Sequence, residues 1–182
     1  MWSKRGHRGD ALEELILLTN SYYQSLGLCR IDKVSTPVKV VDIDAGGMVT
    51  KGFFEKKSTV DFIGVAQGVF LAFDAKETHL KSLPMQNIHA HQIEYMRDVD
   101  CQGGLAFILV HFIFNDAFFL IPYEQIAAYA DSGTRRSIPY KDMDERFAVR
   151  RSDFGGYLNY FDALNAYVAH KEELKKKYTT GL

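Results

Sequence analysis

Two hydrophobic periods alternate along the chain, and together they predict a mixed α/β protein. Apolar residues recur at helical spacing over 10–26, where Gly27 follows as a stop, and again over 89–99, 123–130 and 157–177. Short β-branched and aromatic runs between these helices predict strands. The expected strands are 38–43, 48–54, 62–66, 69–75, 105–111 and 118–121. This order predicts a single mixed central sheet flanked by helices.

A two-residue loop, Gln67-Gly68, separates two of these strands and predicts a β-hairpin. If the loop contains only these residues, Ala66 pairs with Val69, and each outward step pairs the next residues from the turn. This register places Asp61 opposite Asp74, with Cβ atoms about 4.5–5.5 Å apart. The hairpin is therefore expected to bring two carboxylates together on one face.

Lys76 joins this pair, because residues two apart on a strand share a face. The rest of both strands is almost wholly apolar, which predicts burial on both faces. Two like charges at the end of a buried hairpin are unfavourable unless a cation neutralises them, and Mg²⁺ prefers carboxylate and water oxygens. A metal held there activates water for phosphodiester hydrolysis, and Lys76 can position that water or stabilise phosphate charge. The residues alone leave an alternative open, in which Asp61, Asp74 and Lys76 form an exposed fringe.

The net charge of −1 hides an uneven distribution of basic residues. Lys and Arg outnumber Asp and Glu in four segments, which are 1–9, 51–57, 135–151 and 171–177. Grouped basic residues can give a nearly neutral protein a positive face that binds nucleic acid. On charge alone, a set of solvated surface residues remains the alternative.

Composition and length exclude several classes of protein. With 182 residues, 47% hydrophobic and 25% charged, the chain is long enough for its own core, and we expect a single domain over 1–182. No apolar run reaches the roughly 18 residues that span a bilayer, which predicts a cytoplasmic protein without a membrane partner. Neither cysteine has metal-ligand spacing, and His79, His89 and His91 fit capping and surface roles better than a zinc site.

Several stretches of the chain resemble one family of nucleases. Ser58–Gly64 (STVDFIG) and Phe73–Thr78 (FDAKET) resemble the core motif of the PD-(D/E)xK nucleases. Leu83–Glu94 (LPMQNIHAHQIE), Arg8-Gly9 and Arg136–Pro139 (RSIP) resemble one branch of that superfamily. This branch is the RecU family of Holliday junction resolvases, also labelled penicillin-binding protein-related factor A. The resemblance runs from about residue 8 to residue 145.

The resemblance implies a restriction-endonuclease-like core with a projecting β-hairpin stalk at about 38–57 and a basic, flexible N-terminus at 1–9. It implies a homodimeric endonuclease that cuts two strands of a four-way DNA junction symmetrically, in homologous recombination and DNA repair. Mg²⁺ is the implied cofactor, with Mn²⁺ as a substitute. The resemblance also implies nucleoid association, and recombinase and branch-migration proteins as partners.

Residue by residue, the resemblance places Asp61, Asp74 and Lys76 in the catalytic motif. Glu13 falls on the first-helix acid that completes the metal site with the two aspartates, although an exposed helical glutamate fits its position equally. Gln92 falls on a helix near the site, where contact with phosphate or water and a plain polar role are both open. The DNA contacts expected from this helix and the basic segments are Arg8, Lys51, Lys56, Lys57, Gln92, Arg135 and Arg136.

Departures from the family pattern keep other functions open. Asp74 stands where RecU proteins usually have glutamate, segment 42–50 is shorter than its counterpart, and its turn Asp44–Met48 has no arginine. One alternative is a PD-(D/E)xK endonuclease of phage or repair type without junction preference. The other is a non-catalytic DNA-binding recombination factor.

Overall fold

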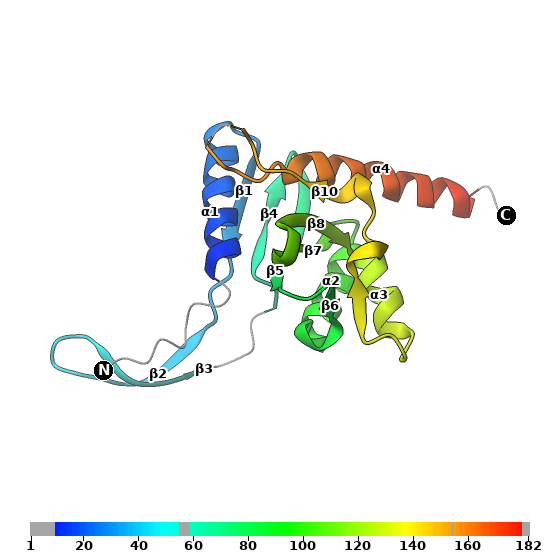
Figure 1. Cartoon of the computed structure of the whole chain (residues 1–182). Helices are drawn as coiled ribbons and strands as arrows, with labels where there is room; N and C mark the ends of the chain where they lie inside the picture. Colours follow the sequence, from blue (N-terminus) through cyan, green and yellow to red (C-terminus); the bar gives the residue numbers. More distant parts are fainter. Residues whose placement is uncertain (1–9, 55–58, 154, 180–182) are drawn as a thin grey trace.

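The computed structural model describes residues 10–54, 59–153 and 155–179, and its centre is a six-stranded sheet (Figure 1). The strands, in their order across the sheet, are β1 (Cys29–Lys33), β4 (Phe62–Ala66), β5 (Val69–Thr78), β7 (Leu105–Phe112), β8 (Ala117–Pro122) and β10 (Ala148–Val149). The α-helices are α1 (Asp10–Ser25), α2 (Ala90–Cys101), α3 (Tyr123–Asp131) and α4 (Tyr160–Thr179). Strands β5 and β7 run parallel and the other neighbours antiparallel, so the predicted mixed sheet flanked by helices is confirmed.

Two hydrophobic clusters cover the two faces of this sheet. Helices α1 and α4 contribute to one cluster, which also contains Phe73 of β5. Helices α2 and α3 contribute to the other, which contains Ala72. Because side chains alternate along a strand, Asp74 and Lys76 belong to the face on which α2 lies.

The β4–β5 hairpin turns through Gln67 at φ +49° and Gly68 at φ +86°. Two successive residues with positive φ are the requirement of a type I′ turn, which matches the twist of the strands that it joins. Ala66 pairs with Val69 and Phe62 with Phe73, as predicted from the sequence. The register that brings Asp61 towards Asp74 is therefore confirmed.

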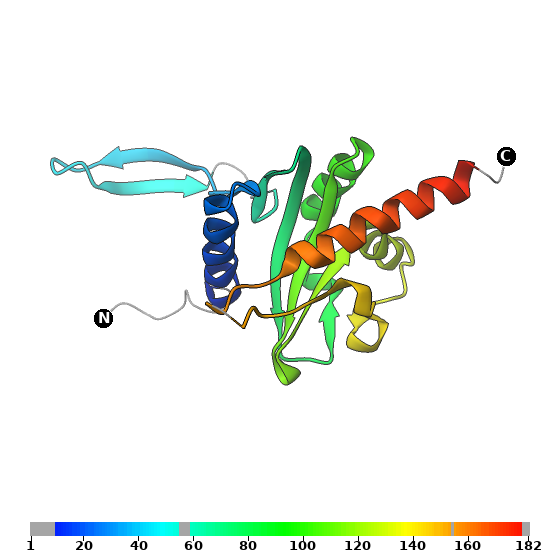
Figure 2. The same cartoon turned by 90° about the horizontal axis from the view of Figure 1, so that it is seen from above.

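A separate two-stranded ribbon, β2 (Val38–Ile43) and β3 (Val49–Phe54), projects from the body (Figures 1 and 2). Every residue of both strands is exposed. We call this ribbon the stalk, and its predicted projection is confirmed. The chain enters it just after β1, where the Val34 N–H donates to the Asp61 carbonyl oxygen at 2.8 Å. The segment that leads into the stalk is thus hydrogen-bonded to the first predicted catalytic residue.

Some elements differ from the sequence-based expectation. The short strands β1, β6 (Ser82–Pro84), β9 (Ser137–Pro139) and β10 were not predicted. Helix α4 begins three residues later than expected, because the backbone of residues 157–159 pairs back with that of residues 150–152. The prediction that both hairpin strands are buried on both faces is wrong near the turn. There Val65 of β4 and Phe70 of β5, which pair with each other, are each 43% exposed, whereas α2 packs on β5 and β7 further along the sheet.

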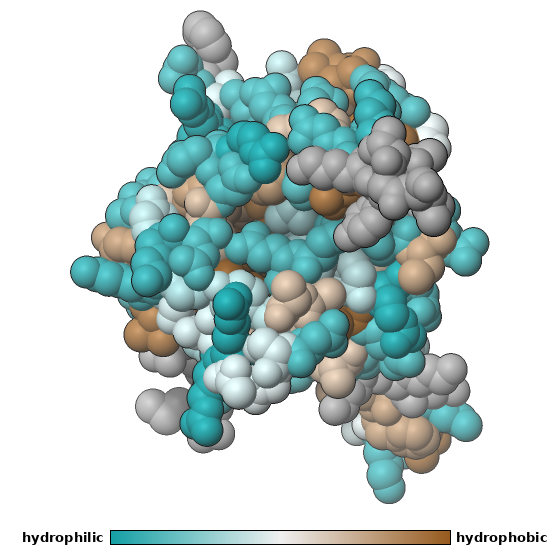
Figure 3. Space-filling view, turned by 90° about the vertical axis from the view of Figure 1, so that its right-hand side faces the viewer, coloured by the Kyte–Doolittle hydropathy of each residue, from teal (hydrophilic) through white to brown (hydrophobic). Residues whose placement is uncertain are grey.

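The surface over the C-terminal side of the molecule is largely hydrophilic, with hydrophobic residues in small separate patches (Figure 3). Among the described residues, none of the helices combines the length and the apolar character that a membrane span requires.

Candidate active site

The β4–β5 hairpin brings the two predicted aspartates into direct contact. The backbone N–H of Asp61 donates to Asp74 Oδ1 at 3.1 Å, and the backbone N–H of Ala75 donates to Asp61 Oδ2 at 3.0 Å. Each carboxylate is thus fixed by the backbone of the opposite strand. The pair predicted from the register alone exists in the structure.

Burial makes two adjacent negative charges at this pair energetically unfavourable. Asp74 is fully buried. Burial of Asp61, and then the charge of the neighbouring Asp74, raises the pKa of the Asp61 carboxyl from 3.8 to about 6. The Ala75 N–H and the Lys76 ammonium act in the opposite direction. Above about pH 6 the buried Asp61 is therefore ionised beside Asp74, an arrangement that a cation stabilises.

One carboxylate oxygen of this pair lacks a hydrogen bond. Asp74 Oδ2 is buried and accepts none from the described residues, although it forms an ion pair with the Lys76 ammonium. The Lys76 side chain is 18% exposed and so reaches towards the surface. A buried carboxylate oxygen with free acceptor capacity beside a second carboxylate suits a hard divalent cation.

Gln92 of α2 holds the other Asp74 oxygen. Its side-chain Nε2 donates to Asp74 Oδ1 at 2.8 Å, and its Oε1 accepts from the backbone N–H of His89 at 2.9 Å. His89 is the N-cap of α2, which agrees with the capping role expected for it. Gln92 is only 6% exposed and both ends of its amide are used, so the structure differs from the predicted DNA contact. Its place favours a role in orienting Asp74 instead.

Glu13 lies apart from this pair. Its Oε2 is 2.5 Å from the Nζ of Lys33 at the end of β1, on the α1 side of the sheet. Over the described residues, no group of three or more His, Cys, Asp or Glu side chains is arranged to hold a metal ion. The structure therefore brings together two of the three predicted metal ligands, Asp61 and Asp74, and pairs the third with a lysine.

A sequence model of one protein family, described as Recombination protein U, RecU, matches residues 7–166 of the chain. The chain belongs to the RecU family. A Holliday junction resolvase RecU from Ligilactobacillus salivarius is 37% identical over 77% of this chain and 69% of the relative. One from Bacillus cereus is 33% identical over 87% of this chain and 84% of the relative. One from Lactococcus lactis is 39% identical over 77% and 68%, respectively.

A solved structure of the Holliday junction resolvase Hjc from Archaeoglobus fulgidus aligns with 64% of this chain and 74% of its own. The TM-score is 0.41 and the sequence identity is 13%.

The predicted DNA contacts of this RecU chain fall in different parts of the structure. Lys51 is exposed on the stalk, and Arg135 and Arg136 are exposed before β9. Arg8, Lys56 and Lys57 lie outside the described residues.

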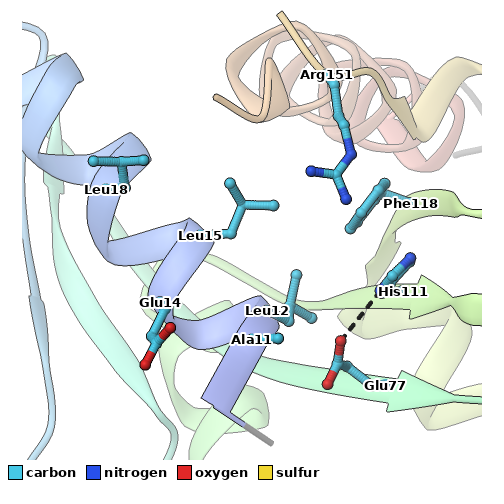
Figure 4. A pocket seen from close by; sticks show the side chains of 9 residues that line it. All are labelled: Ala11, Leu12, Glu14, Leu15, Leu18, Glu77, His111, Phe118 and Arg151. Atoms are coloured by element: carbon cyan, nitrogen blue, oxygen red, sulfur yellow. Dashed lines mark hydrogen bonds and ion pairs between the residues drawn. The ribbon is translucent and has the colours of Figure 1, made fainter. Parts of the chain in front are cut away.

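A cavity of about 380 Å³ lies on the opposite face of the RecU sheet, between α1 and the ends of β5, β7 and β8 (Figure 4). His111 lines it and contacts Glu77 Oε1 through Nδ1 at 3.2 Å and Asp116 Oδ1 through Nε2 at 2.8 Å. Both ring nitrogens are therefore occupied. None of the predicted catalytic residues lines this cavity, and nothing in the sequence pattern singled it out.

Proposed function

We propose that this RecU-family chain is a divalent-metal-dependent endonuclease that cuts four-way DNA junctions in recombination and repair. The observation that carries the proposal is the buried Asp61–Asp74 pair with an Asp74 oxygen that accepts no hydrogen bond from the described residues. Family membership supports the substrate, since the relatives are named Holliday junction resolvases. The motif that the pair forms with Lys76 supports placement in the PD-(D/E)xK superfamily.

Asp61 and Asp74 would hold the metal, and Mg²⁺ or Mn²⁺ suits their hard oxygen donors. Such an ion, when bound, acidifies a water and stabilises the charge that develops on phosphate. Glu13 can join as a third ligand only if its carboxylate leaves Lys33, with which it is paired.

The chain's own groups prepare this site. Gln92 fixes one Asp74 oxygen, and the other, Oδ2, would hold the cation if the Lys76 ammonium with which it is paired moves aside. Lys76 carries the positive charge nearest this oxygen and can orient the attacking water or neutralise a phosphate oxygen. Asp61 is held by the Ala75 N–H, so neither carboxylate needs to reorganise before reaction.

We assign recognition of the junction to the stalk and to the pairing of two copies of this chain. A homodimer presents two identical sites, which suits symmetric cutting of two strands. The chain leading into the stalk is hydrogen-bonded to Asp61 through Val34, and the stalk exposes Lys39 and Lys51, so DNA bound along it would approach the site. The predicted recombinase and branch-migration partners stay predictions.

A second candidate, an endonuclease without junction preference, is favoured by the tip of the stalk. The Asp44 carboxylate accepts from the N–H groups of Gly46 and Met48, each at 2.9 Å, and so places a negative charge in the turn. A negative charge at the tip repels the phosphates of a junction centre.

Cleavage of a labelled four-way junction beside a linear duplex of the same sequence, with Mg²⁺ and with EDTA, separates these functions. We expect paired, symmetric, metal-dependent cuts in the junction alone. Asp61→Asn is expected to lose cleavage by at least about 10³-fold while it still binds the junction, because a metal supplies several kcal/mol of charge stabilisation. Equal cutting of both substrates would favour the second candidate, and full activity of Asp61→Asn would refute the site.

A further inference from the structure

Most basic side chains of the body that the structure describes belong to one of two groups, and Arg150 is an exposed cation outside both. In one group, each cation forms an ion pair with an acidic side chain. These exposed or half-buried cations are Arg30, Lys33, Arg97, Arg146, Arg151 and Lys171. Four cations that have no acidic partner among the described residues gather around one small sheet: Lys81, Arg135, Arg136 and Lys141. All four are exposed. We call this group the basic platform.

The small sheet β6–β9 brings these four residues together from two distant parts of the chain. The Tyr140 N–H donates to the Lys81 carbonyl at 3.0 Å, which places the backbone of Lys81 opposite Tyr140, the residue before Lys141. At the other end of the sheet, the Met85 N–H donates to the Arg136 carbonyl at 2.9 Å. Four residue steps along the strand separate the two ends, a distance of about 13 Å at about 3.3 Å per step.

The platform is firmly attached to the core. Leu83 of β6 and Ile138 of β9 are fully buried in the cluster under α2 and α3. The Tyr140 ring packs edge-on against Phe112 and Phe119, with centroids 5.2 and 5.6 Å away. The backbone that carries the exposed cations is therefore already ordered, and little conformational entropy of this backbone is lost when a ligand binds.

The acidic neighbour of Lys141 is engaged elsewhere. Asp142 Oδ2 accepts from the Tyr129 hydroxyl at 2.5 Å, and the Arg135 guanidinium lies 4.9 Å from the centre of the same Tyr129 ring. Tyr129 thus holds Arg135 from one side and Asp142 from the other. The four basic side chains of the platform outnumber this one acidic neighbour, so the platform carries an excess of positive charge.

A short path connects the platform to the catalytic pair. From β6 the chain continues through a 3-10 turn, Met85–Asn87 (η1), to His89, which caps α2. Gln92 in the first turn of α2 then binds Asp74. The platform and the cation position are therefore connected by one continuous, hydrogen-bonded segment.

We propose that the basic platform binds backbone phosphates of a duplex arm beside the strand that is cut. The proposal rests on the endonuclease function proposed above. The platform is about 13 Å long, which spans the axial rise of about four nucleotides of one DNA strand at 3.4 Å per nucleotide. Contacts of this kind carry no sequence information and fit any duplex. The platform therefore sets affinity for junction and linear duplex alike, whereas the stalk sets the preference between them.

The double variant Lys81→Ala/Lys141→Ala tests this assignment. Its matched control is Arg30→Ala/Arg97→Ala, which removes the same charge from exposed residues that already have acidic partners. Binding to a four-way junction and to a linear duplex is measured in EDTA over a range of KCl concentrations, after circular dichroism has shown that both variants are folded. Wild-type cleavage of the junction with Mg²⁺ is measured on the same preparation.

We expect the plot of log K against log salt for the platform variant to become shallower by about 1.8, since each lost phosphate contact removes about 0.9. The change is expected to be equal for junction and duplex, and absent in the control. A slope that matches the control, or a loss confined to the junction, would overturn the platform assignment. Absence of metal-dependent cleavage by the wild type would instead refute the proposed function, whatever the slopes.

Discussion

The catalytic hairpin and the stalk are both antiparallel hairpins, but they depend on different surroundings. In the catalytic hairpin, the rings of Phe62 and Phe73 stack at 5.0 Å, and Phe73 stacks on Phe107 of β7 at 4.7 Å. The stalk exposes all of its strand residues, among them Phe53 and Phe54. An isolated two-stranded ribbon is marginally stable in water. The core thus fixes the groups of the proposed catalytic site, whereas the stalk strands have no comparable packing among the described residues.

Loss of one aromatic side chain from each hairpin tests this difference most strongly. Phe73→Ala is expected to lower the free energy of unfolding by about 3–5 kcal/mol, because it opens a cavity in the core. Phe53→Ala is expected to change it by no more than about 0.5 kcal/mol, because Phe53 is 54% exposed. Chemical denaturation of both variants is the measurement. A large loss from Phe53→Ala would show that the stalk packs on the body in solution.

The next largest effect concerns the link between α2 and Asp74. Gln92→Leu removes the donor to Asp74 Oδ1 and is expected to lower metal affinity or cleavage by about 10–100-fold, as loss of a group that orients a metal ligand does. Gln102→Leu, at the exposed end of the same helix, is the control. Cleavage rates over a series of Mg²⁺ concentrations, with unfolding measured in parallel, distinguish lost orientation from lost stability. Equal cleavage rates of the two variants at every Mg²⁺ concentration would show that Gln92 does not orient Asp74.

The smallest expected effect is a pH dependence in the metal-free protein. The folded pKa of Asp61 is raised to about 6, so the folded state binds the proton more tightly than the unfolded state, whose pKa is near 3.8. Stability is therefore lost as pH rises between these values, and the cost is complete above about pH 6. Asp61→Asn removes this loss of folding stability, because asparagine does not ionise. In EDTA, this variant is expected to exceed the wild type by about 1–3 kcal/mol at pH 7 and to match it below pH 4.

Thermal unfolding in EDTA at both pH values measures this difference. Addition of Mg²⁺ is expected to stabilise the wild type and not the variant, because a ligand that binds the folded state raises its stability. A variant that is less stable than the wild type at pH 7 without metal would show that the two carboxylates do not oppose each other.

The sequence predicted the catalytic hairpin because its register depends on local chemistry. Gln67-Gly68 suits a type I′ turn. This turn sets which residues of β4 and β5 pair with each other, and the pairing places Asp61 opposite Asp74. The pairing of β6 with β9 could not be predicted in this way. Each strand has three residues, and more than fifty residues separate them, so neither carries a detectable period.

Long-range side-chain contacts also escaped prediction. The resemblance places Gln92 near the site but not its partner, and only the packing of α2 on β5 brings its amide to Asp74. The same limit applies to Glu13, whose partner Lys33 lies on β1, a strand with mixed polarity that gave no signal. Pairing of this kind depends on the tertiary fold rather than on spacing along the chain.

Metal binding to the buried carboxylate pair tests the central claim most directly. Calorimetric titration of Mn²⁺ or Mg²⁺ into the wild type, Asp61→Asn and Asp74→Asn, each shown to be folded, measures it without DNA. The account predicts saturable binding to the wild type that either substitution abolishes or weakens at least tenfold. Equal binding to all three proteins would contradict the account, because the cation would then be held by other residues.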